Sequence, residues 1–323
     1  MTKTSLSLAL MLALISSNSF AETADAFQHE AELGFLDSSE NSDGLLNLNY
    51  SYYFEPVNQA DVPYALAPFL NQYSTISARY AVTDYQDLYN IAGEYVFDSK
   101  FFIGGDYTRN TTEGITLFNS DDSSNFYGVN LGYYFTKQSK LTLAYLWNSD
   151  DVAEQYDGRY YSDENKYGLI KLDYQHYLPF ESTSGLMLNG FILHSSFKNN
   201  SDYTFVLEPD DHISSRTSHS ENSVTVLGVN ADWYITDSWS VGGLYTHFNS
   251  DYDMDGINII TTPDTVVNDN YSFSDSNSND TYSINTRYFW RFSNIFSAKA
   301  SLEQTFVDSD SQTSFGIAIN ARF

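Results

Sequence analysis

The sequence predicts an all-β protein, a transmembrane antiparallel up-and-down β-barrel of about 14 strands, and three observations carry this prediction. Apolar residues occupy every second position in many short segments. The connections between these segments alternate between short and long along the chain. After residue 21, no stretch has the roughly 18 consecutive apolar residues of a transmembrane helix. A barrel strand needs only about ten residues with alternate positions apolar, so a hydrophilic average composition is compatible with a membrane protein.

The clearest alternation is at the C-terminus, in the stretch SFGIAINARF. Its apolar positions are Phe315, Ile317, Ile319, Ala321 and Phe323. Side chains of a strand point alternately to its two faces, so this stretch presents one apolar and one polar face. In a closed barrel the last strand must pair with the first, and we expect that pairing near residues 28–36.

The same period predicts fourteen strands, with 12 or 16 as the alternatives. They are expected at residues 28–36, 44–54, 73–83, 87–97, 101–108, 125–135, 140–148, 167–178, 186–197, 223–234, 240–248, 281–291, 295–306 and 313–323. An even number of strands places both termini at the end of the short turns. Barrels of this kind have short periplasmic turns and long extracellular loops.

The long connections are polar and acidic, which predicts extracellular loops at residues 37–44, 108–124, 150–166, 199–222 and 251–280. One connection at the short-turn end breaks the rule. Residues 55–71 hold three of the six prolines. This segment is either a periplasmic excursion or a plug, and its stretch ALAPF is too short and proline-broken to predict a helix.

Residues 1–21 read as a secretory signal peptide, with an early Lys3, an apolar run of about ten residues and small residues before the cleavage site. We therefore expect a single barrel domain over residues 22–323. The chain has no cysteine and a net charge of −27. Disulfides are thus excluded, and so acidic a chain is not expected to bind nucleic acid.

The signal peptide, the alternating strands and the terminal Phe323 together resemble Gram-negative outer-membrane β-barrels. In that family the C-terminal stripe is read by the barrel-assembly machinery, and Phe315, Ile317, Ile319 and Phe323 match it, whereas Ala321 stands where an aromatic residue is usual. The stretch SYYFEPVNQADVPYALAPFLNQYS resembles general porins of aquatic gammaproteobacteria. The resemblance implies an integral protein of the bacterial outer membrane, in contact with lipid and lipopolysaccharide.

If the apolar stripes face lipid, the opposite stripes face the lumen and bring charges of both signs there. The charged residues assigned to the lumen are Arg79, Lys171, Arg287, Lys299, Arg322, Glu30, Glu32, Glu94, Asp106, Asp173, Asp232 and Glu303. Such charges suit a hydrated pore, where opposed basic and acidic patches would set a transverse field. The alternative is that they pair across strands and narrow the lumen.

These features predict a porin, a passive diffusion channel for small hydrophilic solutes and ions, with loop 108–124 or 251–280 as the constriction. The acidic loops favour cations, because a negative mouth raises the local cation concentration. The alternatives are an adhesin or structural barrel acting through its loops and, with less support, a barrel enzyme. No motif for a hydrolase, a metalloprotease or a phosphate-binding loop occurs, so no catalytic residue and no cofactor is predicted.

A weak metal candidate lies in the stretch DYDMDG, where Asp251, Asp253 and Asp255 have the spacing that begins an EF-hand loop. The twelfth position of such a loop should be a bidentate Glu. Here it is Thr262. We therefore predict a solvated acidic loop at this place, with adventitious cation binding as the alternative.

Overall fold

A computed structural model describes residues 25–323 of the chain, apart from residues 40, 113–121, 157, 208–211 and 309. The predicted signal peptide, residues 1–21, lies outside the described residues, as does most of the predicted loop 108–124. No helix in the described part of the chain is long and apolar enough to cross a membrane.

The described residues form a closed antiparallel barrel of fourteen strands, which confirms the predicted fold class and strand number. Each strand pairs with its neighbours in the sequence, and β1 pairs with β14. The strands are β1 (Ala26–Ser38), β2 (Asn41–Asn58), β3 (Thr75–Val82), β4 (Gln86–Val96), β5 (Phe101–Thr112), β6 (Asp122–Thr136), β7 (Ser139–Tyr156), β8 (Arg159–Leu178), β9 (Gly185–Leu207), β10 (His212–Thr236), β11 (Trp239–Thr261), β12 (Val266–Arg291), β13 (Phe296–Val307) and β14 (Asp310–Arg322).

The barrel closes where β14 meets β1, in the register from Glu30↔Arg322 to Ser38↔Ser314, so the predicted seam is confirmed. Phe323 extends this seam: its N–H donates to the carbonyl of His29 at 3.0 Å, and its ring stacks on the His29 ring. The register of β1 against β2 shifts between Phe27 and His29. This β-bulge turns Phe27 to the inner face of the barrel, where it packs against Tyr53.

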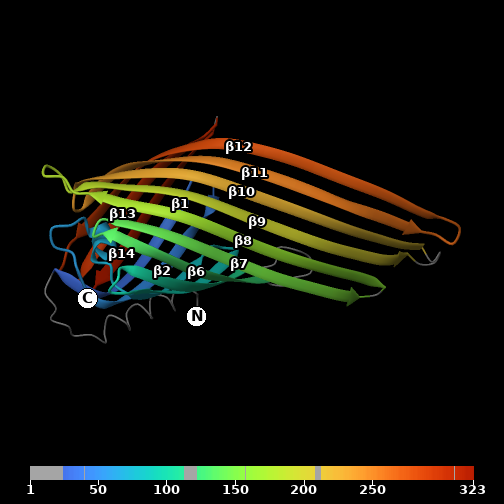
Figure 1. The fold of residues 1–323 in the computed structure, drawn as a ribbon, viewed down its shortest axis with the longest axis horizontal. Helices are drawn as coiled ribbons and strands as arrows, with labels where there is room; N and C mark the ends of the chain where they lie inside the picture. Colours follow the sequence, from blue (N-terminus) through green and yellow to red (C-terminus); the bar gives the residue numbers. More distant parts are fainter. Residues whose placement is uncertain (1–24, 40, 113–121, 157, 208–211, 309) are drawn as a thin grey trace.

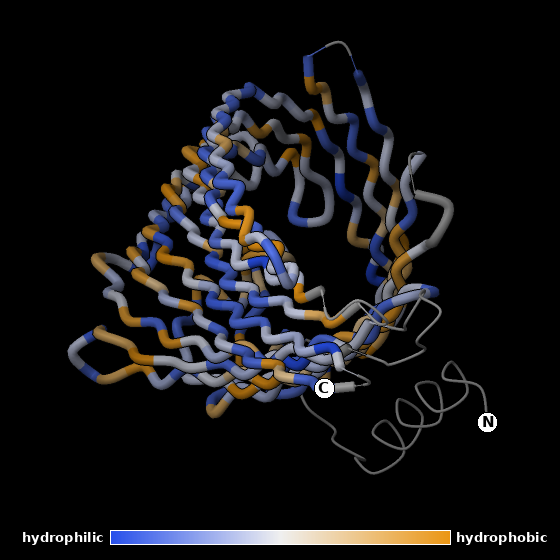
Figure 2. The backbone as a smooth tube through the Cα atoms, turned by 90° about the vertical axis from the view of Figure 1, so that its right-hand side faces the viewer, coloured by the Kyte–Doolittle hydropathy of each residue, from blue (hydrophilic) through white to orange (hydrophobic). Residues whose placement is uncertain are grey.

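The outer face of the barrel is apolar and exposed around its circumference. Ile91 and Ile284 are 61% exposed, and Ile317 is 57% exposed. Figure 2, turned by 90° from Figure 1, shows hydrophobic and hydrophilic residues interspersed along the strands of the barrel. A closed barrel with an apolar outer band satisfies every backbone hydrogen bond within the sheet, which is the condition for crossing a bilayer with strands.

Three of the long polar segments are strands, and the prediction that they are loops was wrong. Residues 150–166, 199–222 and 251–280 extend β7 to β12 in unbroken register up to pairs such as Thr261↔Val266. Figure 1 shows these six strands running far beyond the rest of the barrel. Both faces of a strand meet water outside the membrane, so the apolar alternation stops there although the backbone ladder continues.

Between β2 and β3 the chain forms two short helices at the short-turn end, η1 (Tyr64–Leu66) and α2 (Ala67–Asn71). The sequence did not predict a helix at the stretch ALAPF. Pro68 instead lies in the first turn of α2, where a missing N–H is tolerated. The helix ends at Gln72, which adopts a left-handed conformation with φ 58°.

The lipid-facing assignment is testable with Leu131→Arg on β6, at a side chain that is 56% exposed. We expect this substitution to lower the free energy of unfolding by about 2–4 kcal/mol, because arginine near the bilayer centre is costly. The measurement is urea unfolding of the protein in lipid vesicles, followed by tryptophan fluorescence. The control is Thr142→Arg on the inner face of β7, beside Leu143, the residue paired with Leu131. An equal loss of stability in both variants would contradict the assignment.

Candidate functional site

The strand register determines which charged side chains lie on the inner face of the barrel. Residues directly opposite each other on neighbouring strands share a face. Pairs such as Glu30↔Arg322, Glu94↔Gly104 and Glu303↔Ser314 place the charged residues opposite to the exposed apolar stripe. The same register puts all twelve predicted lumen residues on the inner face: Arg79, Lys171, Arg287, Lys299, Arg322, Glu30, Glu32, Glu94, Asp106, Asp173, Asp232 and Glu303.

Most of these charges are paired with a close neighbour of opposite sign, so the opposed patches that we expected are not formed by the described residues. Lys299 contacts Glu32 and lies 3.8 Å from Glu30. The remaining pairs are Arg322 with Glu30 at 3.0 Å, Arg287 with Asp232 at 3.3 Å and Lys171 with Asp173 at 3.4 Å. Local pairing leaves a polar wall whose charges largely cancel.

Three predicted residues form no ion pair within the described part of the chain: Arg79, Asp106 and Glu303. Asp106 lies over Gly128, whose missing side chain leaves room for the carboxylate. Glu303 accepts a hydrogen bond from the hydroxyl of Thr305 at 3.4 Å. These side chains are the three predicted wall charges that no opposite charge among the described residues compensates.

Lys140 is a lumen residue that the sequence analysis missed, although it is the first residue of the strand predicted at residues 140–148. In the structure β7 begins one residue earlier, at Ser139. The Lys140 ammonium lies 3.2 Å from the Glu94 carboxylate and 4.2 Å from the centre of the Phe102 ring. Lys140 and Thr142 are polar residues at alternate positions of β7, and this alternation is the signal that would have assigned Lys140 to the inner face.

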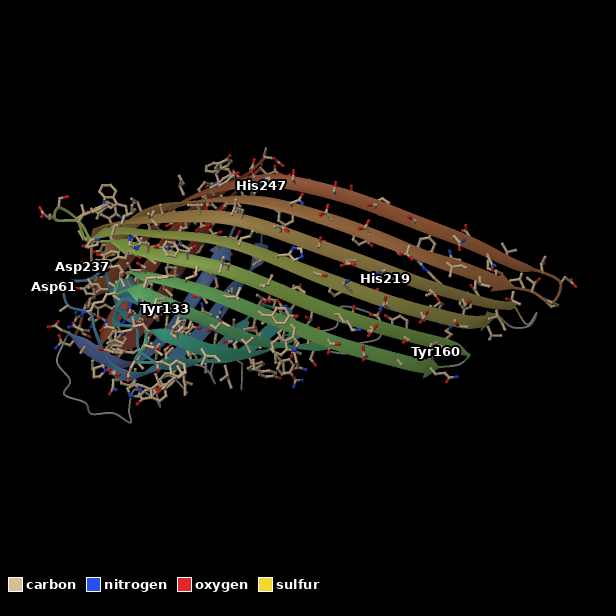
Figure 3. All side chains as sticks on the ribbon, viewed as in Figure 1. Asp61, Tyr133, Tyr160, His219, Asp237 and His247 are labelled. Atoms are coloured by element: carbon tan, nitrogen blue, oxygen red, sulfur yellow. The ribbon has the colours of Figure 1, made fainter. Side chains whose placement is uncertain are left out.

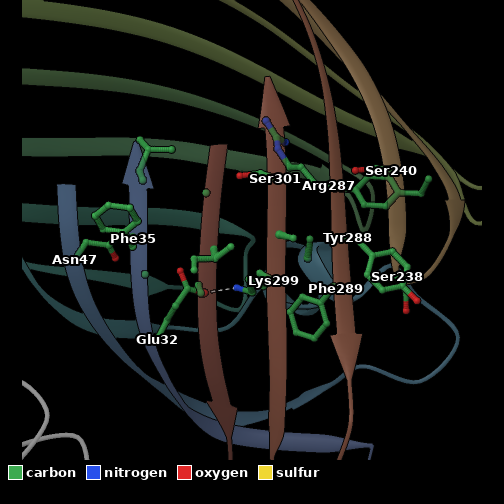
Figure 4. A pocket seen from close by; sticks show the side chains of 18 of the residues that line it. Glu32, Phe35, Asn47, Ser238, Ser240, Arg287, Tyr288, Phe289, Lys299 and Ser301 are labelled. Atoms are coloured by element: carbon green, nitrogen blue, oxygen red, sulfur yellow. Dashed lines mark hydrogen bonds and ion pairs between the residues drawn. The ribbon is translucent and has the colours of Figure 1, made fainter. Parts of the chain in front are cut away.

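A cavity of about 370 Å³ opens into the lumen beside this wall. Its back is formed by small residues such as Gly34, Gly316 and Ala318 on β1 and β14. Figure 4 shows the Glu32–Lys299 pair on one side and Arg287 above Phe289 on the other. Ala65, from the connection between β2 and β3, lines the same cavity, so that connection enters the barrel.

We call residues 59–74 the plug segment, because side chains of the inner wall hold this segment across the short-turn end. The first anchor is Arg322 of β14, which is 5% exposed. Its guanidinium donates to the side-chain oxygen of Gln59 and to the carbonyl of Tyr64, both at 3.0 Å. The rings of Phe27 and Phe289 lie 4.6 and 4.9 Å from the same guanidinium.

Two further anchors lie on other parts of the wall. The N–H of Tyr64 donates to the carbonyl of Asp237, in the β10–β11 turn, at 3.0 Å. The side-chain amide of Gln72 donates to the carbonyl of Thr136 at the end of β6, at 2.7 Å. Figure 3 places Asp61 and Asp237 together at the end of the barrel away from Tyr160. The plug segment is thus attached on several sides of the barrel.

Apolar contacts complete this attachment. Leu66 is buried against Tyr177, Met187 and Tyr234 on β8, β9 and β10. Ala67 packs with Phe27, Tyr53 and Val57 on the opposite side. These two clusters are the hydrophobic core of the described barrel, and they lie between the plug segment and the wall. The plug segment is therefore packed as an interior element and narrows the periplasmic end of the lumen.

The predicted constriction by residues 251–280 was wrong, because they form the continuous β11–β12 hairpin and no infolded loop. Within that hairpin Asp251, Asp253 and Asp255 lie at alternate positions of β11, side by side along one face. A strand cannot wrap around an ion as an EF-hand loop does. No group of three or more metal-binding side chains occurs in the part of the chain that the structure describes.

Comparisons with known proteins bear on the family and on the fold. A family model described as "Putative general bacterial porin" matches residues 1–174. No curated protein matches the chain. Among solved structures, the outer-membrane protein Omp33 of Acinetobacter baumannii is 14% identical, with a TM-score of 0.52, and the match covers 93% of this chain and 100% of that one.

Two other solved structures have lower scores. The siderophore receptor PiuA of Acinetobacter baumannii is 8% identical, with a TM-score of 0.46, over 89% of this chain and 50% of that one. A loop-deletion mutant of OmpT of Vibrio cholerae is 9% identical, with a TM-score of 0.37, over 93% of this chain and 100% of that one. The similarity to Omp33 supports the fold, as that of an outer-membrane barrel.

The packing of the plug segment is testable with Leu66→Ala. We expect this substitution to loosen the segment by about 2 kcal/mol or more, the usual cost of truncating a buried leucine. Amide hydrogen exchange within residues 59–74 should become about thirtyfold faster, while exchange in β14 stays unchanged. The control is Phe180→Ala, at an exposed aromatic residue of the same end. Unchanged exchange in the Leu66→Ala variant would contradict the packed arrangement.

Proposed function

This chain belongs to the family of general bacterial porins, and we propose that it lets small hydrophilic solutes and ions diffuse passively through its lumen. The family and the barrel support a location in the outer membrane and a role as a channel. They favour a channel over an enzyme. The observation that carries the proposal is the inner wall, which is lined by charges of both signs and by small residues.

The polar wall favours a hydrated lumen for a physical reason. Buried charged groups without water or partners cost several kcal/mol each. The ion pairs of Lys140, Lys171 and Arg287 satisfy part of this requirement, and hydration of the remaining lumen satisfies the rest. A solute that passes along such a wall can replace part of its hydration shell with contacts to side chains of both signs.

The plug segment is the constriction in this proposal, in place of an extracellular loop. Its anchors, Arg322, Asp237 and Thr136, hold it from three sides of the wall. A solute therefore reaches the periplasm through the space left beside it. The cavity of about 370 Å³ supports this route, because it lies between Ala65 of the plug segment and the wall of β1 and β14.

We further propose a preference for cations, set outside the membrane. Residues 249–281 carry seven aspartates and no lysine or arginine. The paired charges of the lumen contribute little, because each lies beside its opposite. The field of the extracellular hairpins raises the cation concentration at the mouth, and salt screens this effect over ~8 Å at physiological ionic strength.

The channel is tested by conductance in planar bilayers, with wild type and a variant without the plug. The N–H of Phe54 donates to the carbonyl of Ser74 at 3.0 Å, so β2 and β3 are adjacent there. Residues 56–72 can therefore be replaced by an Asn-Gly turn that joins the two strands. We expect a severalfold larger single-channel conductance in the variant. Unchanged conductance would reject the plug segment as the constriction, and no conductance in either protein would reject the channel.

Ion selectivity is tested with the double substitution Asp106→Asn and Glu303→Gln, which removes the two unpaired acids of the lumen. We expect the reversal potential in a salt gradient to shift moderately towards anions while the preference for cations persists. The control is Asp163→Asn on the extended part of β8. A complete loss of cation preference in the double variant would place the selectivity in the lumen and contradict the extracellular origin.

A further inference from the structure

One edge of the extracellular sheet is open along its whole length. β12 pairs with β13 only from Thr281 onwards. No other strand among the described residues pairs with its outer part, Val266 to Asp280, on that side. The open edge is about 50 Å long at the rise of an extended strand. It forms the upper margin of the long hairpins in Figure 1.

The hydrogen bonds at the two ends of β12 determine which residues present free backbone groups. The N–H of Thr262 donates to the carbonyl of Thr265 at 2.8 Å, and the N–H of Phe289 donates to the carbonyl of Ser238 at 2.7 Å. Odd-numbered residues therefore bond to β11. The register between them is unbroken, so the even-numbered residues direct their N–H and C=O groups to the open edge.

This edge lacks three of the features that usually prevent pairing with another chain, namely a bulge, a proline and a lysine. Its charged residues are all aspartates, so the remaining protection acts against acidic partners and not against basic ones. The part of β12 from Val266 to Asp280 contains no proline and no lysine, and its register with β11 shows no shift. Its outer face carries the short side chains of Ser272, Ser274 and Ser276, which leave the backbone accessible.

The charge beside the edge determines what can pair with it. Ser272, Ser274 and Ser276 stand opposite Asp255, Asp253 and Asp251 of β11, on the same face. A groove of about 590 Å³ is lined by four of these residues, Ser274, Ser276, Asp251 and Asp253, together with Asp275 and with Glu221 and Ser223 of β10. Of the seven aspartates in the hairpin, only Asp280 has an ion pair in the described residues, with His247 at 3.0 Å.

We propose that the open edge of β12 binds an extended polypeptide segment that carries lysine or arginine at alternate positions. The segment adds to the sheet as a further antiparallel strand, and its backbone bonds to the even-numbered residues of β12. Its basic side chains then lie on the outer face. The flexible four-carbon stem of a lysine reaches over the serines to the aspartates of β11.

The charge of the aspartates also argues against a second copy of this chain as the partner. Pairing of two β12 edges would bring two aspartate-rich hairpins together without a compensating cation. Like charges on adjacent strands destabilise a sheet. The aspartates therefore select against self-association and for a basic segment.

The probe is a fluorescent ten-residue peptide of alternating threonine and lysine, with binding to the purified full-length protein in detergent measured by fluorescence anisotropy. A peptide with glutamate in place of lysine should not bind. Residues that exchange both backbone bonds across an antiparallel pair also share a face. The lysines must therefore supply the amides that bond to β12. Methylation of the lysine amides should abolish binding, whereas methylation of the threonine amides should leave it within about twofold, because those amides face away.

Two protein variants separate the backbone from the charge. Ser274→Pro with Ser276→Pro removes two edge N–H groups without touching the ladder to β11, and we expect binding about tenfold weaker or more. Ser274→Ala with Ser276→Ala, the matched control, should bind as the wild type does. Asp251→Asn with Asp253→Asn should weaken binding and reduce its dependence on salt. Heat-modifiable gel mobility verifies that each variant is folded.

The proposal is overturned if both methylated peptides bind equally, because the attraction would then be electrostatic without strand addition. It is equally overturned if the lysine peptide does not bind, or if light scattering finds that the protein alone dimerises and the proline variant does not. None of these outcomes depends on conductance, so the result stands apart from the test of the channel.

Discussion

The constraint on which the whole structure depends is the demand of the bilayer that every backbone N–H and C=O be bonded within the protein. The chain meets this demand by joining β14 to β1 and so leaving no edge at membrane depth. The same closure creates the inner face, where residues such as Lys299 and Glu32 can meet. Outside the bilayer the demand no longer holds, and there the structure leaves the edge of β12 open.

The interior of the barrel compensates its buried polar groups in two ways. Along the wall, charges are compensated by a residue two strands away or two residues along the same strand, as Arg287 of β12 is by Asp232 of β10 and Lys171 by Asp173. At the periplasmic end, the plug segment adds an apolar core around Leu66 and a buried arginine, Arg322, that serves several acceptors. The first arrangement keeps a wall that water can wet, and the second fills the cross-section with packed side chains.

The strands within the membrane could be predicted from the sequence because their two faces meet different surroundings. The stripe that ends at Phe323 shows this, and its pairing with β1 followed from closure alone. The outer parts of β7 to β12 could not be predicted in this way, because water on both faces removes the alternation. Their serine, threonine and asparagine residues were therefore mistaken for loops.

The candidate site was predictable only in part, for a related reason. Alternation assigns a residue to a face, as it did for Glu94, but it does not identify a partner that comes from far along the chain. Lys140 and Glu94 are 46 residues apart, and Arg322 and Gln59 are 263 apart. The two possibilities for residues 55–71 could be decided only by these long-range contacts, which depend on the complete register of the barrel.

Arg322 belongs to the closing strand and also holds the plug segment, so one side chain links two events in the formation of the molecule. Until β14 has paired with β1, the guanidinium has neither Glu30 beside it nor a fixed position from which to reach Gln59 and Tyr64. The early part of the chain that forms the plug segment therefore gains this anchor only after the last strand has arrived. Its other anchors, on β6 and on the β10–β11 turn, do not involve β14, so the joining of β14 to β1 closes the wall and in the same event completes the attachment of the plug segment.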